Sequence, residues 1–127
     1  MYKLRIRRIY EPYSVNDGYR ILIDRLWPRG MSKEKAKEDE WAKQIAPSPE
    51  IRKWFNHEPA KMDQFRQQYR YELDHNEDAA KFVHHVCDQL TRSNVTLLYA
   101  ARDETINHAV ILQQWLEAHE THMRNIH

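Results

Sequence analysis

Residues 21–32 read Ile-Leu-Ile-Asp-Arg-Leu-Trp-Pro-Arg-Gly-Met-Ser, and this stretch decides how the rest of the chain is interpreted. The apolar residues at its start predict the end of a strand. Pro28 cannot donate a hydrogen bond to a sheet and Gly30 permits a positive φ, so the strand must end before them. In a parallel α/β sheet, the loop after a central strand borders the usual ligand crevice. The stretch therefore predicts where a site lies, but not its reaction.

Strand patterns on both sides of this stretch predict a sheet. Leu4 and Ile6 alternate with basic residues, a period of two that is typical of a half-buried strand. Residues 19–23 form the strand before the loop. Residues 95–101 are almost continuously apolar, as in a strand buried on both faces of a parallel sheet. Residues 41–46 are ambiguous, and we favour a short strand because prolines follow at once.

Helix signals fill the rest of the chain. Ser32 is a candidate N-cap for a short basic helix, and Ser48-Pro49 predicts the start of a helix that ends near Phe55. Apolar residues at helical spacing predict two long helices, over residues 62–73 and 79–90, and a last helix after residue 105. We expect the last eight or so residues, within 119–127, to fray.

This order of elements predicts one α/β domain over residues 1–127, a small layered fold with helices flanking a short, mainly parallel sheet. The right-handed crossover rule would place the strand at residues 95–101 beside the strand at residues 19–23. Asp24-Arg25 and Arg102-Asp103 would then face one another at one edge of the sheet. This adjacency is the central structural prediction.

The composition is typical of a soluble globular protein, with 41% hydrophobic and 31% charged residues. No apolar run approaches the ~20 residues of a membrane span, and the N-terminus lacks the pattern of a signal peptide. The single Cys87 excludes an internal disulfide and is typical of a reducing compartment. We therefore expect a cytoplasmic protein that does not contact membranes. Nothing in the sequence indicates its oligomeric state.

The net charge of +1 hides an asymmetry, because residues 1–37 carry ten Lys and Arg against four Asp and Glu. A basic N-terminal third attracts anions, whereas a nucleic-acid binder is usually basic overall. The pattern therefore favours a small anionic ligand over a long polyanion.

Motifs run almost from end to end of the chain. They are Asp17-Gly18-Tyr19-Arg20, Asp24-Arg25-Leu26-Trp27-Pro28-Arg29-Gly30, Ala46-Pro47-Ser48, Trp54-Phe55-Asn56-His57, Phe65-Arg66-Gln67-Gln68-Tyr69, Tyr71-Glu72-Leu73, and Thr96-Leu97-Leu98-Tyr99-Ala100-Ala101 with Asn107-His108-Ala109. On these motifs the chain resembles the YeaO-like family of small uncharacterised bacterial proteins, a domain of unknown function. Longer relatives in that family carry Cys-His-Arg where this chain has Asn107-His108-Ala109. The resemblance therefore implies no thiol nucleophile here, and it implies no particular activity.

Three arginines, Arg25, Arg29 and Arg102, are predicted to converge on a phosphate or carboxylate group. Guanidinium groups bind such anions through paired hydrogen bonds, and a helix start at Ser32 would add backbone N–H donors. The alternative is that Arg25 pairs with a carboxylate such as Asp24 and only fixes the loop.

Proton transfer is predicted at His108, assisted by Asp103. At the start of a helix the neutral imidazole is favoured, which suits a base or a hydrogen-bond donor. The alternative is a capping or packing histidine. Asp24, Glu72 and Asp103 are candidate acids or bases, although carboxylates near arginines more often form salt bridges.

The other candidate ligand-binding residues each have a structural alternative. Trp27 and Tyr69 either line the pocket or belong to the core. His57 either enters the site or holds a turn. The candidates also include Ser48 and Asn107, beside the helix starts.

We expect no metal site and no cofactor. His84, His85 and Cys87 diverge around a helix, and a chain with two glycines has no phosphate-binding loop. The first hypothesis is a protein that binds a small phosphate- or carboxylate-bearing ligand at the carboxyl edge of the sheet, with hydrolysis or group transfer as the reaction if it is an enzyme. The alternative is a non-catalytic nucleic-acid or protein interaction module that uses the basic strand residues Lys3, Arg5, Arg7 and Arg8.

Overall fold

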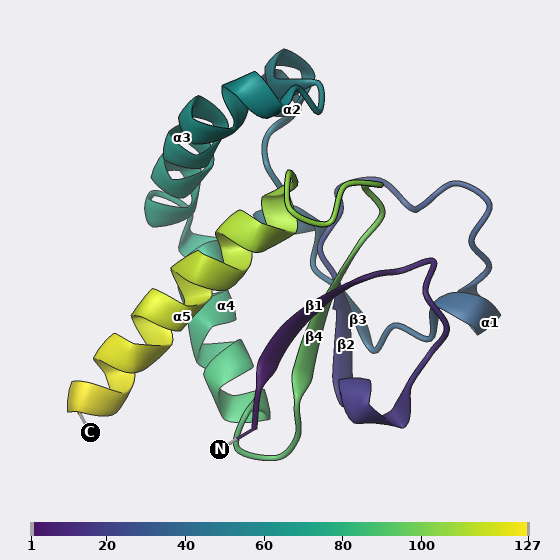
Figure 1. Ribbon diagram of the computed structural model, residues 1–127. Helices are drawn as coiled ribbons and strands as arrows, with labels where there is room; N and C mark the ends of the chain where they lie inside the picture. Colours follow the sequence, from purple (N-terminus) through teal and green to yellow (C-terminus); the bar gives the residue numbers. More distant parts are fainter. Residues whose placement is uncertain (1, 127) are drawn as a thin grey trace.

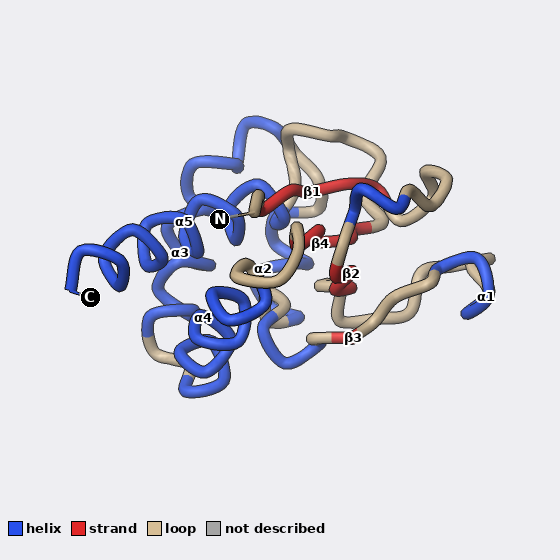
Figure 2. Tube along the Cα trace, turned by 90° about the horizontal axis from the view of Figure 1, so that it is seen from below, coloured by secondary structure: helices blue, strands red, loops and turns tan. Residues whose placement is uncertain are grey.

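The sheet has four parallel strands in the order β1-β4-β2-β3 (Figures 1 and 2). The strands are β1 (Leu4–Arg8), β2 (Tyr19–Leu22), β3 (Glu40–Trp41) and β4 (Val95–Tyr99) in a computed structural model that describes residues 2–126 and the side chains of residues 2–121. All three strand pairings are parallel. The prediction of a small α/β fold is confirmed.

The central structural prediction is confirmed by the pairing of β2 with β4. Tyr19 lies opposite Val95 and Leu22 lies opposite Leu98. The ladder continues one residue further, because the N–H of Ile23 donates to the carbonyl of Leu98 at 3.0 Å. The two strands therefore end level with one another, and the segments that follow them lie at the same edge of the sheet.

The helices lie mainly on one face of the sheet. They are α2 (Pro49–Phe55), α3 (Met62–Asp74), α4 (Glu77–Gln89) and α5 (His108–Ile126), and Figure 1 shows them gathered on one side, with α1 (Lys33–Ala36) apart on the other. Short 3₁₀ turns occur at Val15–Asp17, Lys43–Ile45 and Pro59–Lys61.

Alternating strand residues divide the core between the two faces. Ile21 and Leu97 pack with the large helices, whereas Leu22 and Leu98 pack with Ile9 in a smaller cluster on the other face. All residues of β4 are buried, because this strand is covered on both faces and paired on both edges. Burial on both faces explains the continuous apolar run of β4.

The predicted caps at Ser32 and Ser48 are confirmed. The hydroxyl of Ser32 accepts from the N–H of Lys35 at 3.2 Å, and that of Ser48 accepts from the N–H of Ile51 at 3.5 Å. Both serines satisfy N–H groups that the first turn of a helix leaves unpaired.

The predicted strand over residues 41–46 is wrong beyond Trp41, and the last helix continues into the C-terminal segment. In residues 41–46 the strand ends at Trp41, and a 3₁₀ turn follows over Lys43–Ile45. The last hydrogen bond between β2 and this segment runs from the N–H of Ala42 to the carbonyl of Leu22, at 2.8 Å, and the sheet ends at this point. At the C-terminus α5 extends to Ile126 and includes most of the segment in which we expect fraying, which stays a prediction.

Candidate anion-binding site

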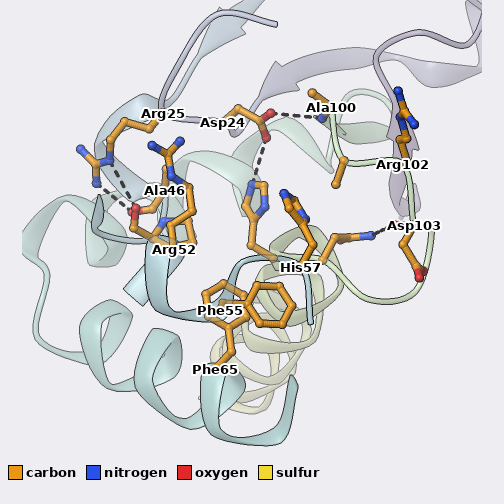
Figure 3. Close-up of a pocket in the computed structure, with 14 residues that line it drawn as sticks. Asp24, Arg25, Ala46, Arg52, Phe55, His57, Phe65, Ala100, Arg102 and Asp103 are labelled. Carbon is orange, nitrogen blue, oxygen red and sulfur yellow. Dashed lines mark hydrogen bonds and ion pairs between the residues drawn. The ribbon is translucent and has the colours of Figure 1, made fainter. Parts of the chain in front are cut away.

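A pocket of about 570 Å³ lies where β2 and β4 end, beside α2 and the start of α5 (Figure 3). Charged, polar and small apolar side chains share its wall. The lining residues are Asp24, Arg25, Ala46, Pro47, Arg52, Phe55, His57, Phe65, Ala100, Ala101, Arg102, Asp103, Asn107 and His108. The site therefore lies at the edge of the sheet where the sequence predicts it.

Asp24 ties the loop after β2 to the end of β4. Its Oδ2 accepts from the N–H of Ala100 at 3.1 Å, and its backbone carbonyl accepts from the indole N–H of Trp41 at 2.7 Å. Its Oδ1 lies 3.1 Å from Nε2 of His108. Asp24 thus fixes the wall of the pocket and also faces the histidine.

His108 has a carboxylate partner other than the predicted one. Its Nε2 lies 3.2 Å from the carbonyl oxygen of Ile23 as well as close to Asp24. The contact with Asp24 lacks hydrogen-bond alignment, so we treat it as an electrostatic pair. Because both neighbours are acceptors, Nε2 must carry a proton, and in the neutral imidazole the lone pair is then on Nδ1.

Asp103 forms no hydrogen bond or ion pair with His108 among the described side chains, so the predicted pairing of these two residues is wrong. Its Oδ1 accepts from the N–H groups of Thr105 at 2.8 Å and Ile106 at 2.9 Å. These backbone hydrogen bonds, with one from the Thr105 hydroxyl, hold the pKa of the Asp103 carboxyl below its ordinary value. Asp103 thereby shapes the loop before α5 and is a weak base.

Asn107 holds the start of α5. Its side-chain N–H donates to the carbonyl of Asp103 at 2.7 Å, and its Oδ1 accepts from the N–H of Val110 at 3.1 Å. Both ends of the amide are therefore used within the chain, although the residue lines the pocket. This arrangement positions the first turn of α5 and leaves no nucleophile at residue 107.

Three arginines line the pocket, but they are not the three that the sequence indicates. Arg25 donates to the carbonyl oxygens of Ala46 at 3.1 Å and Pro47 at 3.3 Å. Figure 3 shows Arg25 and Arg52 on one side of the pocket and Arg102 on the other. Among the side chains of residues 2–121, none forms a hydrogen bond or ion pair with the guanidinium of Arg52 or Arg102.

Arg29 lies outside the pocket, so its predicted convergence with Arg25 and Arg102 is wrong. Its side chain is exposed, and its carbonyl accepts from the hydroxyl of Tyr10 at 2.7 Å. This contact ties the loop to the segment that follows β1. Arg52 takes its place, and one signal could have found it: Arg52 lies three residues before Phe55, on the same face of α2.

Four other predicted ligand contacts are structural residues outside the pocket lining, so their predicted placement is wrong. The indole of Trp27 donates to the carbonyl of Met31 at 2.6 Å, on the face of the sheet away from α3. Tyr69 is fully buried, which raises the pKa of its hydroxyl well above the ordinary value, and it donates to the carbonyl of Ile45 at 2.7 Å. Glu72 accepts from the N–H of Ser48 at 2.9 Å and so joins α3 to α2.

His57 was predicted either to enter the site or to hold a turn, and in the structure it lines the pocket and also lies in a turn. Its φ is 57° and that of Asn56 is 46°. Its side chain is exposed at the pocket, and its ring centroid lies 6.2 Å from that of Phe55.

The basic residues of β1 are largely used inside the molecule. Arg7 pairs with Glu11 at 3.0 Å and with the buried Asp17 at 2.8 Å, while Arg8 donates to the carbonyl of Ala101 at 2.8 Å. Burial opposes ionisation of Asp17, but hydrogen bonds from Arg7, Ser14 and Arg20 bring its pKa below the ordinary value. Internal pairing of this kind leaves fewer cations on β1 available to a nucleic-acid or protein partner.

Two features are absent from the part of the chain that the structure describes. In the described part of the chain, no helix is both long and apolar enough to cross a membrane. Over the same residues, no group of three or more His, Cys, Asp and Glu side chains is placed to hold a metal ion.

Comparison with known proteins identifies the family. Residues 3–125 match the family described as "Inactive DUF488-N3 subclade". The chain is 44% identical over 115 residues to "Uncharacterized protein YeaO" of Escherichia coli, which covers 91% of this chain and 97% of that protein. It is 37% identical over 115 residues to "Uncharacterized protein Mb3100c" of Mycobacterium bovis and to "Uncharacterized protein Rv3073c" of Mycobacterium tuberculosis, covering 90% of this chain and 93% of each of them. No solved structure matches the chain. The chain therefore belongs to the inactive DUF488-N3 subclade, a YeaO-like domain of unknown function.

Proposed function

We propose that the protein binds a small organic anion, with a phosphate or carboxylate group, in this pocket and does not convert it. One observation carries the proposal: Arg25, Arg52 and Arg102 all line the pocket, and no carboxylate of the described side chains pairs with any of them. Arg25 donates only to backbone carbonyl oxygens. Guanidinium groups that line a pocket and have no carboxylate partner are suited to bind carboxylate or phosphate oxygens of a ligand.

The two carboxylates of the pocket offset part of this positive charge but do not pair with the arginines. Asp24 is occupied by the N–H of Ala100 and by His108, and Asp103 is occupied by the N–H groups of its own loop. The start of α5 at His108 adds the positive end of a long helix dipole. A ligand anion would therefore enter a field that favours negative charge.

The geometry supports binding more strongly than turnover. Asn107 supplies no nucleophile, and Nε2 of His108 is directed at Asp24 and at the carbonyl of Ile23. The description of the family as inactive agrees with this interpretation. The pairing of His108 with Asp24 is the one observation that favours a hydrolase or group transferase, since in the neutral imidazole Nδ1 would be the nitrogen that accepts a proton.

The test is a binding screen by calorimetry with inorganic phosphate, phosphate monoesters, carboxylates and short oligonucleotides. A variant with Arg52→Gln and Arg102→Gln should bind the anions at least about 100-fold more weakly than the wild type, because each charged hydrogen bond contributes about 1.5–3 kcal/mol and 1.4 kcal/mol is tenfold. Neither side chain has an internal partner among the described side chains, so the variant should fold normally.

Arg29→Gln is the matched control, because it removes the same charge from the neighbouring loop outside the pocket lining. Equal binding by wild type and the double variant would refute the proposal. Release of inorganic phosphate from a bound ester, if abolished by His108→Ala, would show that the protein is a hydrolase and not only a binding protein. Oligonucleotide binding that is lost only when Lys3 and Arg5 are replaced would support the interaction module instead.

A further inference from the structure

We infer that the pocket selects anions that carry an apolar or aromatic group, and that His57 is the side chain that contacts this group. The inference rests on the proposed function and names the chemical class of its ligand. It is carried by the backbone conformation of His57, by the contacts that its side chain makes, and by the shape of the pocket wall.

The turn that contains His57 would be less strained with glycine at position 57. The N–H of Glu58 donates to the carbonyl of Phe55 at 3.0 Å, and the two central residues, Asn56 and His57, have φ values of 46° and 57°. Positive φ at both central positions is the pattern of a type I′ turn, for which Asn-Gly is the preferred sequence. Asn56 fits its position and also ends α2, since its N–H donates to the carbonyl of Arg52 at 3.0 Å. His57 occupies the position that glycine fills without strain.

The fold makes little use of the His57 side chain. The imidazole is exposed and has no hydrogen bond or ion pair with the described side chains or backbone. Among the described residues, its one ring contact is the tilted approach to Phe55, with 6.2 Å between centroids. A strained residue whose side chain contributes little to the fold is a recurrent feature of ligand sites.

The wall next to His57 is apolar. Phe55 and Phe65 stack with 4.0 Å between centroids and an interplanar angle of 3°, and Ala100 and Ala101 line the same pocket. Figure 3 shows His57 between the side of the pocket with Arg52 and the side with Arg102. A group held there contacts the imidazole while its anion lies within reach of a guanidinium.

The volume also favours an organic ligand. The pocket measures about 570 Å³, whereas one water occupies about 30 Å³ in the liquid. An inorganic phosphate, a few times larger than water, would leave most of this space and the apolar wall in contact with solvent. Pockets of this size, mostly apolar with a few placed polar groups, are typical of organic ligands.

The experiment compares matched pairs of probes on three proteins. Dissociation constants are measured for phenyl phosphate against inorganic phosphate, and for benzoate against acetate, on wild type, His57→Gly and Asn56→Gly. Both glycine variants relieve a positive φ, but only His57→Gly removes a side chain from the pocket lining. Thermal denaturation of each protein shows that it is folded.

For at least one pair, the wild type should bind the aromatic probe about tenfold or more tightly than its inorganic or aliphatic counterpart. His57→Gly should weaken the aromatic probe about 3- to 10-fold, as expected for one aromatic contact, with no loss of thermal stability and no change for the smaller anion. Asn56→Gly should bind like the wild type.

Unchanged binding of the aromatic probe by His57→Gly would overturn the inference and leave the proposed function intact. Equal affinity of the wild type for the aromatic probe and its smaller counterpart in each pair would also overturn the inference and leave the proposed function intact. Absence of binding to every probe would overturn the inference and the proposed function together.

Discussion

At the scale of single residues, the buried Asp17 shows how two arginines of the basic N-terminal third are paired inside the fold. Asp17 is 0% exposed and forms ion pairs with Arg7 and with Arg20, which is itself 2% exposed. Arg20 also donates to the carbonyl oxygens of Ala36 at 2.7 Å and Lys37 at 3.1 Å. The cluster therefore joins β1, β2 and α1 below the smaller core cluster. Its arginines stabilise the fold and are not available to a partner.

Replacing Asp17 by Asn should lower the free energy of unfolding by about 3–5 kcal/mol, because it leaves buried guanidinium charge uncompensated. Urea denaturation at neutral pH measures the change. Asp63→Asn is the control, since that carboxylate pairs with Arg66 but is 96% exposed, and its effect should stay within about 1 kcal/mol. A loss for Asp17→Asn as small as that of the control would contradict the structural role of the cluster.

The same carboxylate predicts a loss of stability in acid. The pKa of Asp17 is below its ordinary value in the folded protein, so the contribution is fully present above the pKa of the unfolded chain. It is lost as the pH falls through the folded pKa, which lies below the ordinary 3.8. Urea midpoints from pH 7 to 2 should therefore fall most steeply below about pH 4, and less steeply in Asp17→Asn. Parallel curves for the two proteins would contradict this account.

At the scale of elements, the junction of α2 and α3 places Arg52, Phe55 and His57 at the pocket. Ser48 caps α2 through its hydroxyl, and its own N–H is satisfied by Glu72 of α3. The stacked rings of Phe55 and Phe65 join the same two helices. Glu72 thus positions the wall of the pocket without lining it.

Glu72→Ala should lower the free energy of unfolding by about 1–3 kcal/mol, because it leaves the N–H of Ser48 without its partner. The affinity for anions should change less than about threefold, since Glu72 is not part of the pocket lining. Gln67→Ala, an exposed position on the same helix, is the control for stability and should change it by less than about 0.5 kcal/mol. Chemical denaturation and calorimetry on the same samples separate the two effects, and loss of affinity with unchanged stability would restore Glu72 as a ligand contact.

Regular elements were predictable from the sequence, and the loop side chains were not. Periodic apolar residues predicted α3, α4 and β4, and the crossover rule placed β4 beside β2. Arg29 was wrongly predicted as a ligand contact, because a loop has no apolar periodicity from which the direction of a side chain can be inferred. Contacts such as those of Trp27 with Met31 and Tyr10 with Arg29 decide the direction of that loop. The partner of His108 likewise depends on where the start of α5 meets the end of β2, which no local pattern encodes.

At the scale of the whole molecule, the site results from the topology. The carboxyl ends of β2 and β4, the end of α2 and the start of α5 meet at one edge of the sheet (Figure 1). Three arginines that pair with no carboxylate among the described side chains lie there, whereas Arg7 of β1 is paired with Glu11 and Asp17. Of these three arginines only Arg25 belongs to the basic N-terminal third, so the fold assembles the positive charge of the pocket from segments that are distant in the sequence.

The most direct test of this account is a titration of the ¹⁵N-labelled protein with phenyl phosphate and benzoate, followed by amide chemical shifts. The account predicts that shift changes concentrate in residues 24–25, 46–57 and 100–109, which surround the pocket, and that they disappear in the double Arg52→Gln, Arg102→Gln variant. Changes concentrated in residues 3–8, or changes that persist unaltered in that variant, would contradict it.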